Sequence, residues 1–260
     1  MNVGKSMAQT FRAPEIVEIA RREGKVTVEE LAERFGVTLQ TIRRDLTELA
    51  DAGRLERVHG GAILPSSTTN IGYEDRRALN SQEKVDIARA CARELPEDCS
   101  VFLNIGTTTE AVAAELLNHR NLMAVTNNMN VANILAGNAD CQVIVTGGSL
   151  RRSDGGLVGS ITTDTIRKFK FDYAIIGCSA LDNDGDLLDF DIHEVGVSQA
   201  IIAQARHVFV VADHTKFGRS APARIGSLAS VDVFFTDRPI ASRLRAECDA
   251  WGTRVVYGQG

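Results

Sequence analysis

The chain has 260 residues, of which 44% are hydrophobic, with 29 basic and 34 acidic side chains and a formal net charge of -5. This length and hydrophobic content allow a well-buried core in one large α/β domain or in two unequal ones, and they exclude a chain that is disordered throughout. Bulk charge does not indicate nucleic-acid binding, because neither the first 60 residues nor the remainder has an excess of basic groups.

The N-terminal stretch predicts two helices. Pro14 fits the first turn of a helix that runs to about Glu23 and stops at Gly24. A second helix follows Thr27, whose hydroxyl can cap it while Glu30, three residues later, completes a capping box. Both helices carry an apolar face that needs a partner.

A third helix follows the turn at Gly36. Thr38 is its expected N-cap, and Ile42, Leu46 and Leu49 have the i, i+4, i+7 spacing of a buried stripe. The next segment, RLERVHGGAIL, alternates and contains a Gly-Gly pair, so we expect a small β-hairpin or wing. Two helices joined by a tight turn, with a helix before them and a hairpin behind, predict a winged helix-turn-helix.

In that fold the third helix would enter the major groove of DNA, where arginine pairs with guanine and amide side chains pair with adenine, while the wing would contact the backbone. The alternative is that the arginine pair is only a solvated helix face, since Glu48, Asp51 and Glu56 lie nearby. We favour DNA binding because caps, turn, stripe and hairpin occur together. The residues expected to contact DNA are Thr38, Gln40, Thr41, Arg43, Arg44, Arg54, Arg57 and His59.

The stretch LPSSTTNIG, which starts at Leu64, is polar, contains Pro65 and has no periodicity, and this is typical of a linker. We therefore predict a DNA-binding domain at 1–63, a linker at 64–80 and an effector-binding domain at 81–260.

In the last of these ranges, segments with helical periodicity alternate with apolar runs such as CSVFLNI, CQVIVTG and HVFVVAD. Apolar strands separated by helices predict an α/β fold with a doubly wound, mostly parallel sheet covered on both faces. The helices are expected near 82–94, 109–118, 128–137, 160–169, 192–205 and 240–249.

The segment NIGTTTEA begins at Asn104 and joins an expected strand to an expected helix. Gly106 permits close approach of a ligand to the backbone, and a helix N-terminus supplies unpaired N–H groups. The hydroxyls of Thr107, Thr108 and Thr109 can donate further hydrogen bonds. The pattern predicts a phosphate site; the alternative is that one threonine only caps the helix.

Other polar groups follow other strands, and in an open parallel sheet these carboxyl ends share one edge, where ligands bind. Lys216 is the expected counter-charge for a phosphate, because an acidic domain would otherwise repel an anion. The alternative is a surface lysine in a loop. The predicted effector site consists of Asn104, Gly106, Thr107, Thr108, Thr109, Asn127, Asn128, Gly147, Gly148, Asp213 and Lys216.

No metal, cofactor or membrane segment is expected. The five cysteines are never closer than eight positions, and the five histidines include no His-x-x-x-His pair, so neither a disulfide framework nor a zinc site is indicated. No apolar run reaches the roughly 18 residues that span a bilayer, and the first residues lack the apolar block of a secretory signal. A cytoplasmic location is the expectation.

An enzyme is the competing hypothesis for the second domain. Isomerase or deaminase chemistry needs a carboxylate base and an acid at the substrate. Candidate groups near expected strand ends are Asp182, Asp189, Asp191, Glu194, Asp213 and His214. Such carboxylates can equally hold ligand hydroxyls, and a DNA-reading module has no use for turnover of its own signal. We expect a sensor without catalytic residues; a third possibility is a DNA-bound scaffold whose second domain has no ligand.

The string VTVEELAERFGVTLQTIRRDLTELADAGRLERVHGGA closely resembles the N-terminal domain of the DeoR family of bacterial repressors, whose hallmark is a Thr-Ile-Arg-Arg-Asp-Leu helix followed by an Arg-x-x-Gly-Gly-Ala ending. The resemblance implies that Thr41, Arg43 and Arg44 lie in the DNA-contacting helix. The segments NIGTT, TNNMNVAN, SDGGLVG, DFDIHEV and DHTKFGR are similar to the family's effector domain, whose fold resembles ribose-5-phosphate isomerase and glucosamine-6-phosphate deaminase.

The resemblance implies a repressor of a carbon-catabolic operon that binds double-stranded operator DNA and is released by a small phosphorylated effector, with glycerol 3-phosphate preferred. We expect a homodimer or homotetramer, because paired N-terminal domains fit repeated operator half-sites. The alternative is an isomerase-like or deaminase-like enzyme fused to a DNA-binding module. The family usually has Asp-x-Gly-Thr-Thr, and Asn104 replaces its first residue. The amide keeps an acceptor but no charge, which bears on ligand identity more than on phosphate binding.

Overall fold

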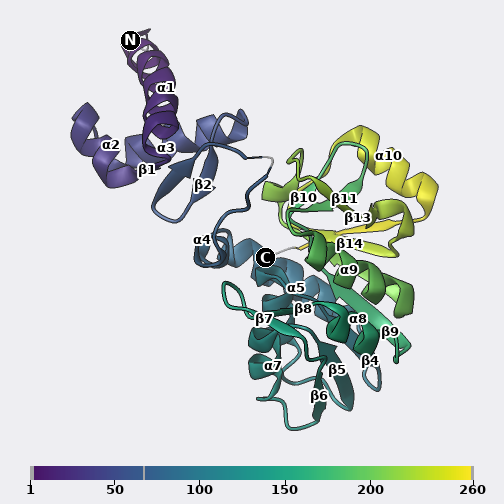
Figure 1. The fold of residues 1–260 in the computed structure, drawn as a ribbon. Coiled ribbons are helices and arrows are strands. Elements are labelled where there is room, and N and C mark those ends of the chain that lie inside the picture. The colour runs from purple at the N-terminus through teal and green to yellow at the C-terminus, as the bar shows by residue number, and fades with distance from the viewer. Residues whose placement is uncertain (1–2, 67, 259–260) are drawn as a thin grey trace. The chain divides into compact units, whose positions relative to one another are not determined.

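A computed structural model describes residues 3–66 and 68–258 of the chain (Figure 1). These residues form two compact units. The N-terminal unit contains the described residues up to 66 together with 74–79. The C-terminal unit contains 68–73 and 80–258.

The N-terminal unit is a helical domain with a short antiparallel sheet of order β1-β3-β2. Val26 on β1 and Arg57 on β2 both lie opposite Ala62 on the central strand. The predicted winged helix-turn-helix is confirmed, and β1 is a strand that the sequence pattern did not indicate. The elements are α1 (Val3–Glu23), β1 (Lys25–Thr27), α2 (Val28–Phe35), α3 (Leu39–Asp51), β2 (Glu56–Val58), β3 (Gly61–Ile63) and α4 (Tyr73–Ala78).

Side-chain and glycine caps define where α2 and α3 begin and end. Thr27 Oγ1 accepts a hydrogen bond from the Glu30 N–H at 3.2 Å and donates one to the Glu30 carboxylate at 2.7 Å. Gly36 ends α2 with φ of 62°, in the left-handed region that glycine adopts without strain. Thr38 Oγ1 accepts from the Thr41 N–H at 3.2 Å. Both predicted N-caps are confirmed.

Helix α1 is longer than the sequence predicts. We expected Pro14 in the first turn, but the helix begins at Val3, so Pro14 lies in its interior. An interior proline removes one backbone N–H and the hydrogen bond that it would make. The same helix fully buries Ile16 and Ala20 against the other helices, and this tertiary packing outweighs the missing bond.

A seven-stranded sheet forms the centre of the C-terminal unit, with order β15-β14-β12-β9-β4-β5-β6 and parallel pairing throughout. The chain builds outward from β4 to β6, then crosses to β9 and builds outward to β15, so the switch point lies between β4 and β9. The doubly wound prediction is confirmed. The strands are β4 (Ser100–Leu103), β5 (Leu122–Thr126), β6 (Cys141–Val145), β9 (Phe171–Ile176), β12 (Ala205–Val211), β14 (Val233–Thr236) and β15 (Arg254–Tyr257).

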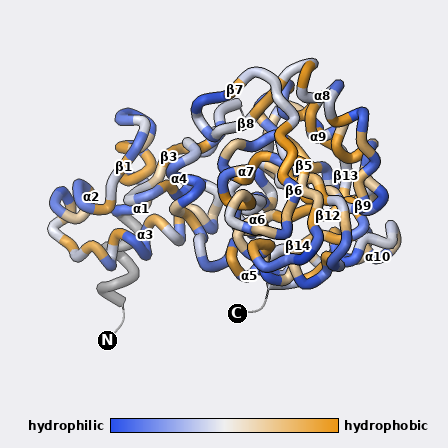
Figure 2. Tube along the Cα trace, turned by 90° about the horizontal axis from the view of Figure 1, so that it is seen from below, coloured by the Kyte–Doolittle hydropathy of each residue, from blue (hydrophilic) through white to orange (hydrophobic). Residues whose placement is uncertain are grey.

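Helices cover both faces of this sheet. Val101 and Leu103 belong to a core cluster shared with α5, α6 and α7, whereas Phe102 between them belongs to a second cluster shared with α8, α9 and α10. Figure 2 shows hydrophobic stretches gathered in the interior around β5 and β12. The helices are α5 (Ser81–Arg93), α6 (Thr107–Glu115), α7 (Met129–Leu135), α8 (Ser160–Ile166), α9 (Ile192–Gln204) and α10 (Ser242–Trp251), close to the predicted positions.

Two smaller sheets were not predicted. A hairpin, β7-β8, follows β6, and an antiparallel sheet of order β10-β11-β13 includes the two strands that follow β9. Both therefore continue from the carboxyl end of the large sheet, the edge at which Gly106 also lies. None of the described helices is long and apolar enough to cross a membrane. The remaining elements are β7 (Ser149–Arg151), β8 (Gly156–Val158), β10 (Ala180–Leu181), β11 (Asp186–Asp189), β13 (Ala223–Ser227) and the 3-10 turns η1 (His214–Lys216) and η2 (Leu228–Ser230).

Candidate DNA interface and effector site

Helix α3 has one buried and one exposed side. Ile42 and Leu46 are fully buried in the core of the N-terminal unit. Gln40 and Arg43 lie on the opposite side and are exposed. The side expected to contact DNA is therefore free of packing contacts with that core.

Some expected DNA-contacting side chains already have partners in the N-terminal unit. Arg44 Nε lies 3.0 Å from Glu48 Oε1, one helical turn away, and both side chains are exposed. An exposed pair of this kind is weak, so a phosphate can replace the carboxylate. The hydroxyls of Thr38 and Thr41 lie 2.9 Å apart, and Thr38 also caps the helix. Thr38 thus has the capping role predicted for it, and its contact with DNA stays a prediction.

Arg57 on β2 is half-buried in the N-terminal unit. Burial, followed by the positive charge of Arg43, lowers the pKa of the Arg57 guanidinium. Among the residues that the structure describes, its Nη1 has no hydrogen-bond partner. A half-buried cation beside a second cation is unfavourable without an anion, and a DNA phosphate would supply one. The other residues predicted in the wing region, Arg54 and His59, are exposed.

Asp45 on this helix was not among the residues predicted to matter for DNA binding. Its side chain is 3% exposed, and Arg12 Nε on α1 donates to its Oδ2 at 2.8 Å. The pair joins α3 to α1 and so fixes the angle of the exposed side. The helical spacing predicts this burial, because Asp45 follows Ile42 by three positions and so lies on the same side of the helix, facing the core.

The turn between β4 and α6 lies at the switch point of the sheet. It consists of residues 104–106, and the helix begins at Thr107. The first N–H groups of a helix have no acceptor within it. Thr109 donates its hydroxyl to carbonyl oxygens of the turn, including that of Gly106 at 2.7 Å, so it is committed to the turn itself. The first-turn N–H groups and the hydroxyls of Thr107 and Thr108 are the groups this turn offers to an anion.

Asn104 is used to hold the turn in place. It is 1% exposed. Its Nδ2 donates to Ser198 Oγ on α9 at 2.8 Å, and its Oδ1 accepts from the Ile105 N–H at 2.7 Å. An aspartate at this position could also accept from the Ile105 N–H. It could not donate to Ser198 Oγ and would have to accept a hydrogen bond from that hydroxyl instead. The amide thus fits the polarity that the structure shows here.

The asparagines after β5 are buried at the same edge. Asn128 Oδ1 caps α7 by accepting from the Asn130 N–H at 2.7 Å. Asn127 Nδ2 donates to the Leu157 carbonyl at 3.1 Å. In the described part of the chain the Asn127 Oδ1 has no partner, which leaves one buried acceptor that a ligand hydroxyl could satisfy.

The glycines after β6 pack against neighbouring elements. The carbonyl of Gly147 accepts from Thr162 Oγ1 at 2.8 Å. A Cβ on Gly148 would lie 2.1 Å from that same hydroxyl oxygen and 2.8 Å from the Val158 carbonyl oxygen. Close packing of α8 and β8 therefore accounts for Gly148 independently of any ligand.

Asp213 and Lys216 lie after β12, at the same carboxyl edge. Burial opposes ionisation of Asp213, but the charges of Lys216 and Lys84 and a hydrogen bond from Thr215 lower its pKa below the usual value. Lys84 on α5 is 5% exposed and was not predicted as a site residue. The sequence did place it on the buried side of its helix, three positions before Ile87, where lysine is rare unless paired.

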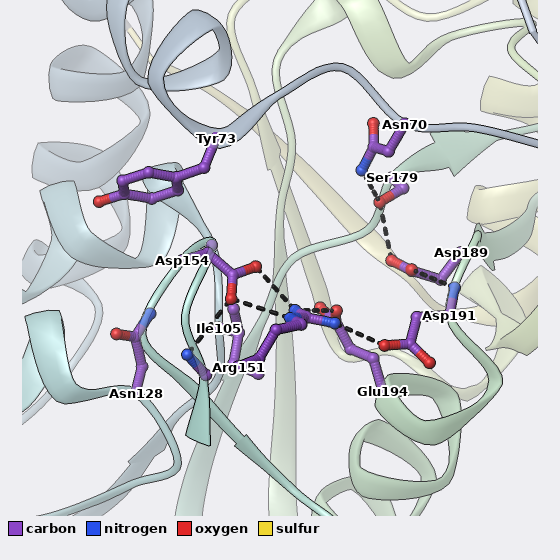
Figure 3. Close-up of polar contacts among 12 residues, drawn as sticks. Asn70, Tyr73, Ile105, Asn128, Arg151, Asp154, Ser179, Asp189, Asp191 and Glu194 are labelled. Atoms are coloured by element: carbon purple, nitrogen blue, oxygen red, sulfur yellow. Dashed lines mark hydrogen bonds and ion pairs between the residues drawn. The ribbon is translucent and has the colours of Figure 1, made fainter. Parts of the chain in front are cut away.

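A group of three carboxylates surrounds Arg151 on β7 (Figure 3). Its guanidinium donates to Asp154 Oδ1 at 2.9 Å, to Asp191 Oδ2 at 2.7 Å and to Glu194 Oε2 at 2.5 Å. From the sequence, Asp191 and Glu194 were expected only as possible catalytic groups, and no role was predicted for Arg151. Their separation along the chain hides the cluster from any local pattern.

The β7-β8 hairpin carries this cluster against the turn after β4. A Cβ on Gly156 would lie 2.6 Å from Ile105 Cδ1, and the Leu157 N–H donates to the Asn127 carbonyl at 2.7 Å.

Burial, together with the charge of Asp189, raises the pKa of Glu194 to about 7, against the opposing effect of Arg151. Within the described part of the chain, no group of three or more His, Cys, Asp or Glu side chains is placed to hold a metal ion.

A helix-turn-helix with an exposed arginine face, combined with a doubly wound domain that offers anion-binding groups at its switch point, defines the class of DNA-binding regulators with a sensor domain. Residues 12–68 match the DeoR-like helix-turn-helix domain, and residues 79–238 match the DeoR C terminal sensor domain. The chain belongs to the DeoR family. The family predicted from the Thr-Ile-Arg-Arg-Asp-Leu helix is thereby confirmed.

The chain is similar over most of its length to curated repressors. It is 50% identical to the glycerol-3-phosphate regulon repressor of Escherichia coli (strain K12), covering 90% of this chain and 92% of the relative. Identity to the protein of that name from Haemophilus influenzae is 45%, covering 88% and 90%, and to the HTH-type transcriptional repressor CsqR of Escherichia coli 38%, covering 95% of each. These relatives make the chain a transcriptional regulator rather than an enzyme.

Similarity to solved structures is weaker. Ribose 5-phosphate isomerase A from Methanocaldococcus jannaschii is 13% identical with a TM-score of 0.39, covering 53% of this chain and 55% of that one. The translation initiation factor eIF-2B of Pyrococcus horikoshii is 12% identical with a TM-score of 0.44, covering 88% of each chain. Neither likeness bears on the ligand.

Proposed function

We propose that the protein represses an operon for the use of glycerol phosphate, and that glycerol 3-phosphate bound in the C-terminal unit releases it from operator DNA. The anion-binding groups at the switch point carry this proposal: the N–H groups at the start of α6 lie at the same sheet edge as Lys216. The 50% identity to a glycerol-3-phosphate regulon repressor supports the choice of ligand.

In this proposal the phosphate group is bound by the first turn of α6, with the hydroxyls of Thr107 and Thr108 as further donors. Lys216 and Lys84 supply positive charge. The remaining residues of the predicted effector site, including Asp213 and the residues after β5 and β6, lie along the same edge of the sheet. Asn127 Oδ1 accepts a hydrogen bond from a ligand hydroxyl.

The DNA-binding part of the proposal uses Gln40, Thr41, Arg43 and Arg44 on α3 for the major groove, and Arg57 with its neighbours for the phosphate backbone. We infer a homodimer or homotetramer in the cytoplasm, whose paired domains fit half-sites about one helical turn apart or a multiple of it. Domain limits of 1–63 and 81–260, joined through 64–80, complete the proposal. The effector then acts on operator affinity through the joining segment.

The test is operator binding with and without glycerol 3-phosphate, measured by fluorescence anisotropy on a duplex that the protein itself selects from a random pool. We expect the ligand to weaken binding by about 5- to 150-fold, the usual range of allosteric coupling. Glycerol without phosphate should have no effect. Lys216→Ala should bind the duplex normally but need much more ligand. An unchanged operator affinity at saturating glycerol 3-phosphate would refute the choice of ligand.

A further inference from the structure

Residues 68–73, which we call the strap, are part of the C-terminal unit, whereas residues 74–79 are part of the N-terminal unit. The strap is attached near its middle. Asn70 Nδ2 donates to Ser179 Oγ at 2.9 Å, and Ser179 Oγ donates to Asp189 Oδ2 at 2.7 Å. Ile71 is 7% exposed. The strap is therefore fixed by both polar and apolar contacts.

Its last residue, Tyr73, makes a second attachment, to Glu110 on α6. The Tyr73 hydroxyl lies 3.0 Å from Oε1 and 2.9 Å from Oε2 of Glu110. Asn130 Nδ2 lies 2.9 Å from the Tyr73 oxygen, 3.0 Å from Glu110 Oε1 and 3.1 Å from the Asp154 carbonyl oxygen. Glu110 is 8% exposed, so the carboxylate side of the attachment is buried.

Glu110 stands one helical turn inside the site proposed for the phosphate. Its backbone N–H donates to the Gly106 carbonyl at 2.9 Å, in the turn that precedes the first N–H groups of α6. One turn of helix is about 5.4 Å long. An anion at that helix start therefore comes close to the Glu110 carboxylate, and two negative charges in a buried setting repel each other.

The residues that follow Tyr73 continue the same short helix, α4. Within the N-terminal unit, Asp75 accepts a hydrogen bond from the backbone N–H of His59 at 3.1 Å, and its Oδ1 lies 3.9 Å from Lys25 Nζ. His59 is in the turn between β2 and β3. One helix thus begins at a residue bonded to the sensor site and continues into one bonded to the wing.

We propose that Tyr73 is a latch: without effector it holds the strap to Glu110, and an anion at the start of α6 breaks this contact and thereby changes operator affinity. The latch rests on the proposed function of the effector site and specifies how that site is coupled to DNA. Tyr73 lies on α4 and belongs neither to α3 nor to the proposed phosphate donors, so its loss should act on the coupling.

The test compares wild type with Tyr73→Phe, Glu110→Ala and the double variant, using the self-selected duplex described above. Tyr257→Phe is the matched control, because it removes a phenol hydroxyl that interacts with Arg245 elsewhere in the same unit. Without effector, Tyr73→Phe should bind the duplex about fivefold or more weakly than wild type. Glycerol 3-phosphate should then change its affinity less than about twofold, whereas the control should respond like wild type.

The double variant separates a direct contact from two independent defects. If Tyr73 and Glu110 act through one contact, the double variant binds the duplex about as weakly as either single variant. Additive effects overturn the latch. Thermal unfolding monitors folding, and Glu110→Ala reports on the same contact should Tyr73→Phe be unstable.

Duplex binding measured without effector tests the latch independently of which ligand is the effector. If Tyr73→Phe binds the duplex as tightly as wild type in the absence of effector, the latch is overturned whatever the effector is. A weakened Tyr73→Phe together with a wild type that ignores glycerol 3-phosphate upholds the latch and refutes that ligand.

Discussion

In the N-terminal unit, burial and the positive charge of Arg43 lower the pKa of the Arg57 guanidinium. Arg57→Ala should weaken operator binding by about 1–3 kcal/mol, because a phosphate contact is lost. The slope of log affinity against log salt should fall by about one unit. Fluorescence anisotropy at several salt concentrations measures both quantities.

The matched control for this change is Arg34→Ala on α2, where an exposed arginine lies 3.7 Å from Glu23. That variant should retain both the affinity and the salt slope of wild type. An unchanged salt slope for Arg57→Ala would show that Arg57 has no phosphate partner. A large loss of folding stability would show instead that its role is structural.

Residues whose role is local could be predicted, and residues whose role depends on distant chain segments could not. Thr27 and Thr38 act on N–H groups three residues away, so their spacing in the sequence carries the information. Arg151 acts on Glu194, 43 positions later. The role of Lys84 could be predicted only in part, because helical periodicity shows that the side chain is buried but does not show which groups it faces.

At the level of elements, the β7-β8 hairpin and α8 meet at Gly148. Its φ is 122°, which L side chains rarely adopt, and an added Cβ would lie 2.1 Å from Thr162 Oγ1. Gly148→Ala should destabilise the C-terminal unit by about 2–4 kcal/mol, through strain and overpacking together. Urea unfolding followed by fluorescence of Trp251, the single tryptophan, reports on this unit.

Gly196→Ala on α9 is the control for that change. Gly196 has no neighbour within 4 Å of an added Cβ and no positive φ, and alanine is favoured in a helix interior. The variant should be as stable as wild type or up to about 1 kcal/mol more stable. Equal stability of the two variants would contradict the packing assigned to Gly148.

The large elements were predictable because their signals are repeated along the chain. Apolar runs alternating with helices identify the parallel sheet, since each strand must be buried on both faces. The smaller sheets lack such a signal: β10 has two residues and β7 and β8 have three each. Their pairing depends on where the large sheet places them, and this information is absent from a local pattern.

At the scale of the whole molecule, pH should affect stability through the C-terminal unit. Glu194 faces Arg151 and lies near Asp154 and Asp189, and burial with these carboxylates raises its pKa from 4.5 to about 7. A folded pKa above the unfolded value means that the folded state binds more protons between these two values. The associated stability is present at low pH and is lost as pH rises through about 7.

Glu194→Gln should remove this dependence, because the amide is neutral at every pH. Relative to wild type, the variant should be similar near pH 5 and gain up to about 3 kcal/mol by pH 8, the energy of a shift of this size. Urea unfolding followed by Trp251 fluorescence at several pH values measures the difference, and groups that titrate equally in both proteins cancel. Parallel stability curves would mean that Glu194 is ionised in the folded protein throughout this range, with Arg151 outweighing its burial.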